Sequence, residues 1–105
     1  MATIIDGRKQ YQAVFTRVWQ VSETIDFANA ATGSGTFASA EVTVPGVALG
    51  DIVMGVSAGV DTVDAVIGGA VTAANTVTLT LLNNTAGGVN LASTTVRFVV
   101  ARMSI

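Results

Sequence analysis

The sequence predicts a single all-β domain, an antiparallel β-sandwich of jelly-roll-like type with about eight short strands. Three observations lead to this prediction. Short runs alternate apolar and polar residues with a period of two, as half-buried strands do. The eleven glycines fall mostly in polar segments between these runs. No stretch combines helical periodicity with capping residues. A length of 105 residues corresponds to one domain, so we expect a sandwich domain over residues 11–105.

Residues 1–10 are expected to form an N-terminal arm. Asp6-Gly7 is a turn signal, and three polar residues follow it. A solvated tail is one interpretation. The other is an arm that docks on a neighbouring subunit, which would explain Ile4 and Ile5, since a free tail does not need them.

The first strands are predicted at 11–21 and 24–28, with a break at Ser22-Glu23. β-Branched and aromatic residues dominate both segments, and residues 11–21 place large aromatic side chains on one face. A helix is the rival assignment for residues 11–21. The β-branched content and the absence of caps weigh against it.

A strand over 36–44 is expected to end at the only proline of the chain, Pro45, because proline has no N–H to donate. Pro45 and Gly46 suit the central positions of a type II turn. Gly50 then lets the chain turn again. Asp51 is expected to accept backbone N–H groups within that turn. Val47 and Leu49 are expected to cover the end of the core.

The remaining strands follow from the same alternation. The clearest is 75–82, where valine and leucine alternate with threonine. Asn83 to Gly88 form a turn cluster. The other predicted strands are 52–57, 63–67, 70–73 and 94–103, of which 63–67 and 70–73 are separated by Gly68-Gly69.

The composition excludes several classes of function. Without cysteine or histidine, the chain lacks a thiol nucleophile and the commonest general base and metal ligand. We therefore expect no enzyme, no cofactor and no metal ion. The net charge of −2 and the scattered basic residues argue against a nucleic-acid partner.

Charged residues make up only 11% of the chain and the mean hydropathy is +0.63. A membrane protein could explain this, but a spanning helix needs about 20 apolar residues and the longest mostly apolar stretch, 65–74, is shorter. The better interpretation is a subunit that covers part of its surface in an assembly, such as a homo-oligomer.

The remaining candidate sites carry weak signals. Asp61 and Asp64 could form a catalytic carboxylate pair, but a solvated turn pair is the favoured interpretation. The glycine pairs lack the lysine or helix of a phosphate loop. Tyr11, Phe15 and Trp19 could form a platform for stacking sugars, although such a stripe is more often core.

Two segments carry a resemblance to a known family: EVTVPGVALGD at 41–51 and AANTVTLTLLNNTAGGVNLASTTVRFVV at 73–100. This pattern resembles a β-sandwich module of tailed-bacteriophage virion proteins, including capsid decoration (cement) proteins and head-fibre proteins. It covers roughly the C-terminal two thirds of the chain and does not include the segment before Thr36.

The resemblance implies a non-enzymatic structural protein of the virion, a homotrimer on the outer surface of the phage head that stabilises contacts between major capsid subunits. After assembly in the host cytoplasm it would lie on the capsid surface. For the contact with the major capsid protein we predict the N-terminal part, with Arg8, Lys9 and Arg17 facing capsid acids. The alternative is a head- or tail-fibre module that binds host-surface glycans. An exposed Trp19 would favour that alternative.

Overall fold

The chain forms two antiparallel β-sheets in the computed structural model, which describes residues 3–6, 14–27, 36–62, 65–83 and 91–105. These residues contain no helix, so the all-β prediction is confirmed. They form seven strands where about eight were expected. The strands are β1 (Thr3–Asp6), β2 (Phe15–Ile25), β3 (Thr36–Thr43), β4 (Ile52–Ala58), β5 (Val66–Ala73), β6 (Thr76–Asn83) and β7 (Thr94–Met103).

Two predicted strand breaks are wrong. β2 runs through Ser22-Glu23, because these residues continue the pairing with β7 up to Ile25. β5 runs through Gly68-Gly69, which pair with Thr80 and Leu79 of β6. The neighbouring strand supplies a pairing partner at both places, and this outweighs the local preference of the residues for turns. At Gly69 the absence of a side chain also has a packing role, because an added Cβ would lie 2.8 Å from Leu79 Cδ2.

The N-terminal segment differs from the predicted arm. Thr3–Asp6 form β1, an edge strand that pairs with β2 of the same chain and places Ile4 opposite Val21. The sheet therefore begins inside the segment expected to be an arm, and the predicted domain boundary at residue 10 needs this correction. Arg8 and Lys9 lie outside the described residues.

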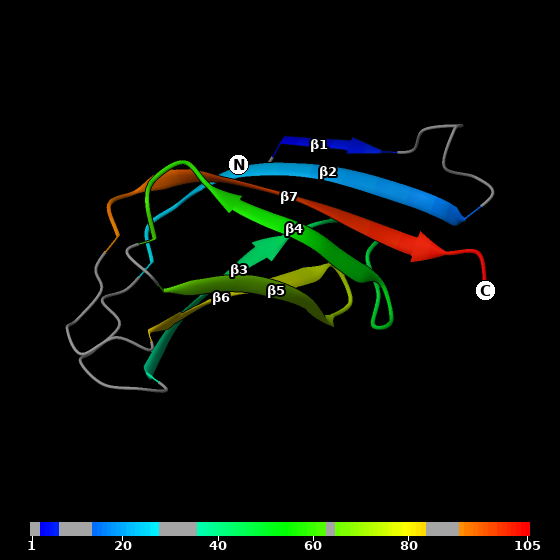
Figure 1. The fold of residues 1–105 in the computed structure, drawn as a ribbon. Coiled ribbons are helices and arrows are strands. Elements are labelled where there is room, and N and C mark those ends of the chain that lie inside the picture. Colours follow the sequence, from blue (N-terminus) through cyan, green and yellow to red (C-terminus); the bar gives the residue numbers. More distant parts are fainter. Residues whose placement is uncertain (1–2, 7–13, 28–35, 63–64, 84–90) are drawn as a thin grey trace.

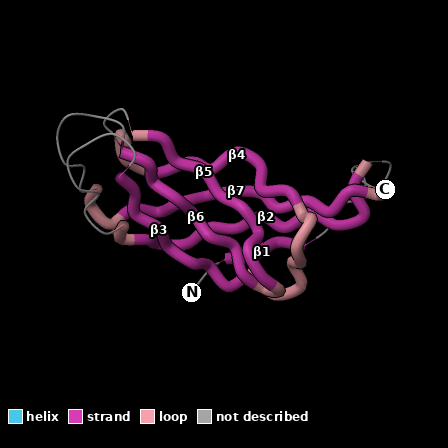
Figure 2. Tube along the Cα trace, turned by 90° about the horizontal axis from the view of Figure 1, so that it is seen from below, coloured by secondary structure: helices cyan, strands magenta, loops and turns pink. Residues whose placement is uncertain are grey.

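The two sheets form two layers (Figure 1). One has the strand order β1-β2-β7-β4 and the other the order β3-β6-β5. Successive strands from β2 to β5 alternate between the layers, so each connection crosses from one sheet to the other. β4 and β5, the edge strands at one side, contact each other across the two layers and are neighbours in the view of Figure 2.

One hydrophobic core lies between the layers, and the period-two alternation explains its composition. Alternate residues of each central strand point inward, while the threonines of β6 point outward. The side chains that β6 contributes to this core are Val77, Leu79 and Leu81, and those from β7 are Val96, Phe98 and Val100. Residues from both sheets therefore bury one shared apolar cluster, which is the main stabilising contribution.

Two adjacent leucines of β6 test this division between the inner and outer faces. Leu81 is 0% exposed and Leu82 is 38% exposed. We expect Leu81→Ala to lower the free energy of unfolding by about 2–5 kcal/mol, because it leaves a cavity in the core. Leu82→Ala should cost less than about 1 kcal/mol. Urea unfolding of the two variants measures both values, and equal losses would contradict the assignment of the faces.

Candidate functional site

Residues 44–51 form a corner of two successive turns that carries the chain from β3 in one sheet to β4 in the other. In the first turn Val47 N–H donates to the Val44 carbonyl, and Gly46 has φ +98°. In the second, Asp51 N–H donates to the Ala48 carbonyl, and Gly50 also has φ +98°. Both central glycines thus adopt the positive φ that a type II turn requires at its third residue.

Asn75, in the turn between β5 and β6, connects the corner to the three-stranded sheet by hydrogen bonds. The Asn75 side-chain oxygen accepts from Gly46 N–H at 2.8 Å. Its backbone carbonyl accepts from Val44 N–H, and its own N–H donates to the Val47 carbonyl. Asn75 has φ +62°, a conformation that asparagine tolerates better than most residues. Val47 is buried at the end of the core, as expected, but Leu49 is 71% exposed and does not cover it.

Asp51 connects the same corner to the four-stranded sheet by an ion pair with Arg102 of β7. Arg102 Nε and Nη2 donate to the two carboxylate oxygens of Asp51, both at 2.9 Å. Arg102 Nη2 also donates to the Gly46 carbonyl at 2.9 Å. Ala48 N–H donates to Asp51 Oδ2. The Asp51 side chain is only 5% exposed and that of Arg102 is 37% exposed, so this two-point ion pair is partly shielded from water.

Trp19 of β2 lies beneath the two arginines. Its indole N–H donates to the Pro45 carbonyl at 3.2 Å. The guanidinium carbons of Arg17 and Arg102 lie 4.6 and 5.4 Å from its ring centroid, within the range of cation–π attraction. Arg17 and Arg102 are directly opposite in the register of β2 and β7. We call Arg17, Trp19, Asp51 and Arg102 the arginine–tryptophan cluster.

This cluster changes the interpretation of two predicted sites. Trp19 is buried, so its ring is not an exposed platform for sugars. Phe15 is half-buried, and Tyr11 lies outside the described residues. Arg17, predicted to contact the capsid, is half-buried, and a Cβ added at Gly46 would lie 2.8 Å from Arg17 Nη1. Arg17 therefore packs against the corner of its own chain.

The cluster also sets the charge state of Asp51. Burial by itself would raise the pKa of the Asp51 carboxyl group. The hydrogen bonds from Arg102 and Ala48, together with the positive charges of Arg102 and Arg17, outweigh burial and hold this pKa below its ordinary value. The ionised form of Asp51 is therefore the one that the fold stabilises.

A second feature lies on the outer face of the three-stranded sheet. Phe37 pairs with Leu82, and Leu82 pairs with Val66, so these side chains form an apolar row across the sheet. Phe37 is 65% exposed and Val66 is 60% exposed. We call these three residues the apolar row.

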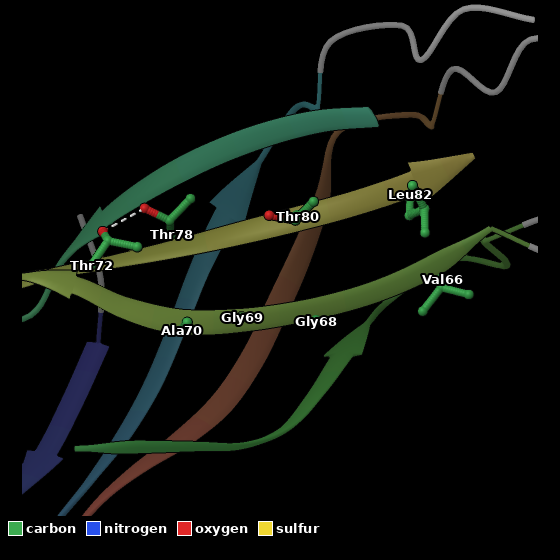
Figure 3. A pocket seen from close by; sticks show the side chains of 8 residues that line it. All are labelled: Val66, Gly68, Gly69, Ala70, Thr72, Thr78, Thr80 and Leu82. Carbon is green, nitrogen blue, oxygen red and sulfur yellow. Dashed lines mark hydrogen bonds between the residues drawn. The ribbon is translucent and has the colours of Figure 1, made fainter. Parts of the chain in front are cut away.

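A shallow groove of about 350 Å³ follows β5 and β6 from the apolar row toward the other end of the sheet (Figure 3). The groove exists because Gly68 has no side chain and Ala70 has only a methyl group on this face. At its far end the hydroxyl groups of Thr72 and Thr78 are hydrogen-bonded at 2.7 Å. The remaining lining residues are Val66, Gly69, Thr80 and Leu82. The groove therefore combines an apolar end with a threonine-lined end.

The other sequence-predicted candidates show no assembled chemistry in the described part of the chain. Asp61 is exposed, and Asp64 lies outside the described residues. No group of three or more potential metal-ligating side chains lies together among the described residues. In the same residues we find no helix with the length and apolar character needed to cross a membrane.

Sequence reasoning missed two residues that hold the corner in place, and each had a signal. Arg102 continues the inward-facing series Val96, Phe98 and Val100, so a charge on that face needed a partner. The alternation places Asn75 at the start of a strand, although asparagine between two alternating runs is also a turn signal. The partners themselves could not be predicted, because Arg102 and Asp51 are 51 positions apart in the sequence.

Acid titration tests the role of Asp51. Because its pKa is lowered in the folded state, its contribution to stability is fully present above the unfolded value of about 3.9 and is lost as the pH falls through the folded value. We expect Asp51→Asn to be less stable than the wild type at neutral pH, with a difference that shrinks below about pH 4. Urea unfolding across this range measures it. Asp26→Asn, at an exposed side chain outside the cluster, is the matched control; a difference for Asp51→Asn that does not depend on pH would contradict the assignment.

Comparison with known proteins adds no family. Family models, curated proteins and solved structures were compared with this chain, and no match was found. Because one fold can carry many functions, the functional argument rests on the surfaces described above.

Proposed function

We propose that the chain is a non-enzymatic structural protein of a bacteriophage virion, a capsid decoration protein that binds the outer surface of the head and stabilises contacts between major capsid subunits. The proposal starts from the resemblance of residues 41–51 and 73–100 to such proteins. It places the shell-facing surface on the outer face of the three-stranded sheet.

The apolar row is the observation that carries this proposal. A solvated face of an antiparallel sheet is normally polar, and the threonines of β6 follow that rule. Phe37, Leu82 and Val66 depart from it while lying side by side across three strands. Contiguous exposed apolar side chains are typical of protein–protein interaction sites. The groove beside the apolar row could accept a projecting side chain of the partner.

The strand order supports the finer structural part of the proposal. We interpret the two layers as a jelly-roll-like β-sandwich, because successive strands from β2 to β5 alternate between the sheets and β7 lies between β2 and β4. Jelly rolls are recurrent in viral capsid proteins, but also in lectins. The fold is therefore compatible with a virion role and does not by itself select it.

The arrangement of the arginines argues against the cationic contact expected from the sequence. Arg17 packs against Trp19 and Gly46, and Arg102 is paired with Asp51. If either arginine bound an acidic side chain of the capsid protein instead, its contacts with the corner would be lost. The glycan-binding alternative loses the observation that would have favoured it, since Trp19 is buried.

Particles from the source phage that lack this protein provide the test. We expect purified wild-type protein to bind them on the capsid lattice, located by cryo-electron microscopy. Phe37→Asp should weaken binding at least about tenfold, because it puts a charge into an apolar contact. Val60→Asp, at an exposed apolar side chain of the β4–β5 connection, is the matched control and should bind normally. Density at the tail, or unchanged binding by Phe37→Asp, would contradict the proposal.

A further inference from the structure

We infer that β3 is a self-association edge, which pairs antiparallel with β3 of a second copy about a two-fold axis and joins two three-stranded sheets into one six-stranded sheet. Among the described residues, β3 pairs with β6 on one side and with no strand on the other. The inference concerns the purified protein and does not depend on the proposed capsid function.

Of the edge strands that the structure describes, β3 is the least protected. β1 has only four residues, and β4 is interrupted by a register shift between Met54 and Ser57, with Gly55 at φ +58°. β5 has a register shift near its end and lies against β4. Short strands, bulges and coverage are the usual devices that prevent edge-to-edge pairing. β3 has eight residues in unbroken register, with no proline, lysine or arginine.

The backbone groups of β3 that point away from β6 can be assigned from one hydrogen bond. Val44 N–H donates to the Asn75 carbonyl, so the backbone groups of Val44 point toward the β6 side. In a strand the N–H and C=O groups of one residue point to the same side, and those of the next residue point to the other side. The even-numbered residues of β3 therefore bond to β6, and the backbone groups of Phe37, Ser39, Glu41 and Thr43 point to the open edge. These same four side chains lie on the exposed outer face.

Symmetry then restricts the register. Residues directly opposite each other have their side chains on the same face of the sheet. Because the faces alternate along β3, two paired residues are both odd-numbered or both even-numbered, and the sum of their numbers is even. Pairing Glu41 with itself would oppose two carboxylates, which is destabilising. Centring the pair on Ala40 uses all four outward residues and gives about eight hydrogen bonds, two for each pair. The pairs are then Phe37 with Thr43 of the second copy and Ser39 with Glu41 of the second copy, each formed twice.

This register is chemically complementary. The Ser39 hydroxyl group can donate to the opposing Glu41 carboxylate, and Phe37 can pack on the methyl group of the opposing Thr43. The two outer faces become one surface that carries two apolar rows. Centring on Ser39 instead would give about six hydrogen bonds and oppose Phe37 to Glu41, so the Ala40-centred register is favoured.

A proline substitution tests the pairing of the edge. Ser39→Pro removes an N–H that points to the open edge, and proline is tolerated at such positions of edge strands. Sedimentation velocity should show wild-type protein moving from monomer to dimer as its concentration rises. Ser39→Pro should remain a monomer with an unchanged urea midpoint, whereas Ser39→Ala, which keeps the N–H, should still form dimers. A wild-type monomer at all concentrations, a trimer, or a dimer that survives Ser39→Pro would overturn the inference.

Cross-linking tests the register and remains informative if Ser39→Pro does not fold. The chain has no cysteine, so an engineered pair reports without background. Opposed residues in this register have Cα atoms about 5.5 Å apart, which a disulfide can bridge. The double variant Ser39→Cys/Glu41→Cys should form a covalent dimer on oxidation, and Ser39→Cys alone should give little. Efficient cross-linking by Ser39→Cys alone, or no cross-linking by the double variant, would contradict the Ala40-centred pairing.

Discussion

The ion pair between Asp51 and Arg102 is the contact that holds the corner between the two sheets against β7. Asp51 belongs to the corner that leads from β3 to β4, and Arg102 belongs to β7 in the opposite sheet from β3. A carboxylate with so little exposure is stable only with a hydrogen-bonded partner. Arg102 supplies that partner and also bonds to Gly46, while Asn75 holds the corner from the other side. The corner thus joins both layers at one end of the core.

Trp19 explains why two arginines can lie opposite each other next to this pair. Like charges on adjacent strands repel, but both guanidinium groups lie over the indole ring, and Asp51 lowers the local charge. The buried indole N–H is satisfied by the Pro45 carbonyl. Arg17, predicted to contact a partner, is therefore used within the chain, whereas in the described part of the chain the apolar row is exposed and β3 has a strand on one side only.

The sequence predicted the fold class because strand alternation is a local property. The apolar series Val77, Leu79 and Leu81 identifies both a strand and its buried face, and Gly46 and Gly50 identify turns by their own conformational freedom. Strand ends were predicted less well, since β2 and β5 continue where a neighbouring strand supplies partners. The cluster was beyond sequence reasoning, because it joins residues from β2, the corner and β7 through a register that only the folded sheets define. The apolar row could not be predicted from the sequence either, because its three residues come from three different strands.

A double-mutant cycle on Asp51 and Arg102 tests this account most directly. Asp51→Asn, Arg102→Gln and the double variant would be unfolded in urea at neutral pH. If the pair fastens the corner, the loss in the double variant should differ from the sum of the single losses by at least about 1 kcal/mol, because each single variant leaves the other group without its partner. Losses that add to within about 0.5 kcal/mol would show that the two residues act independently, and would contradict the central role assigned to this pair.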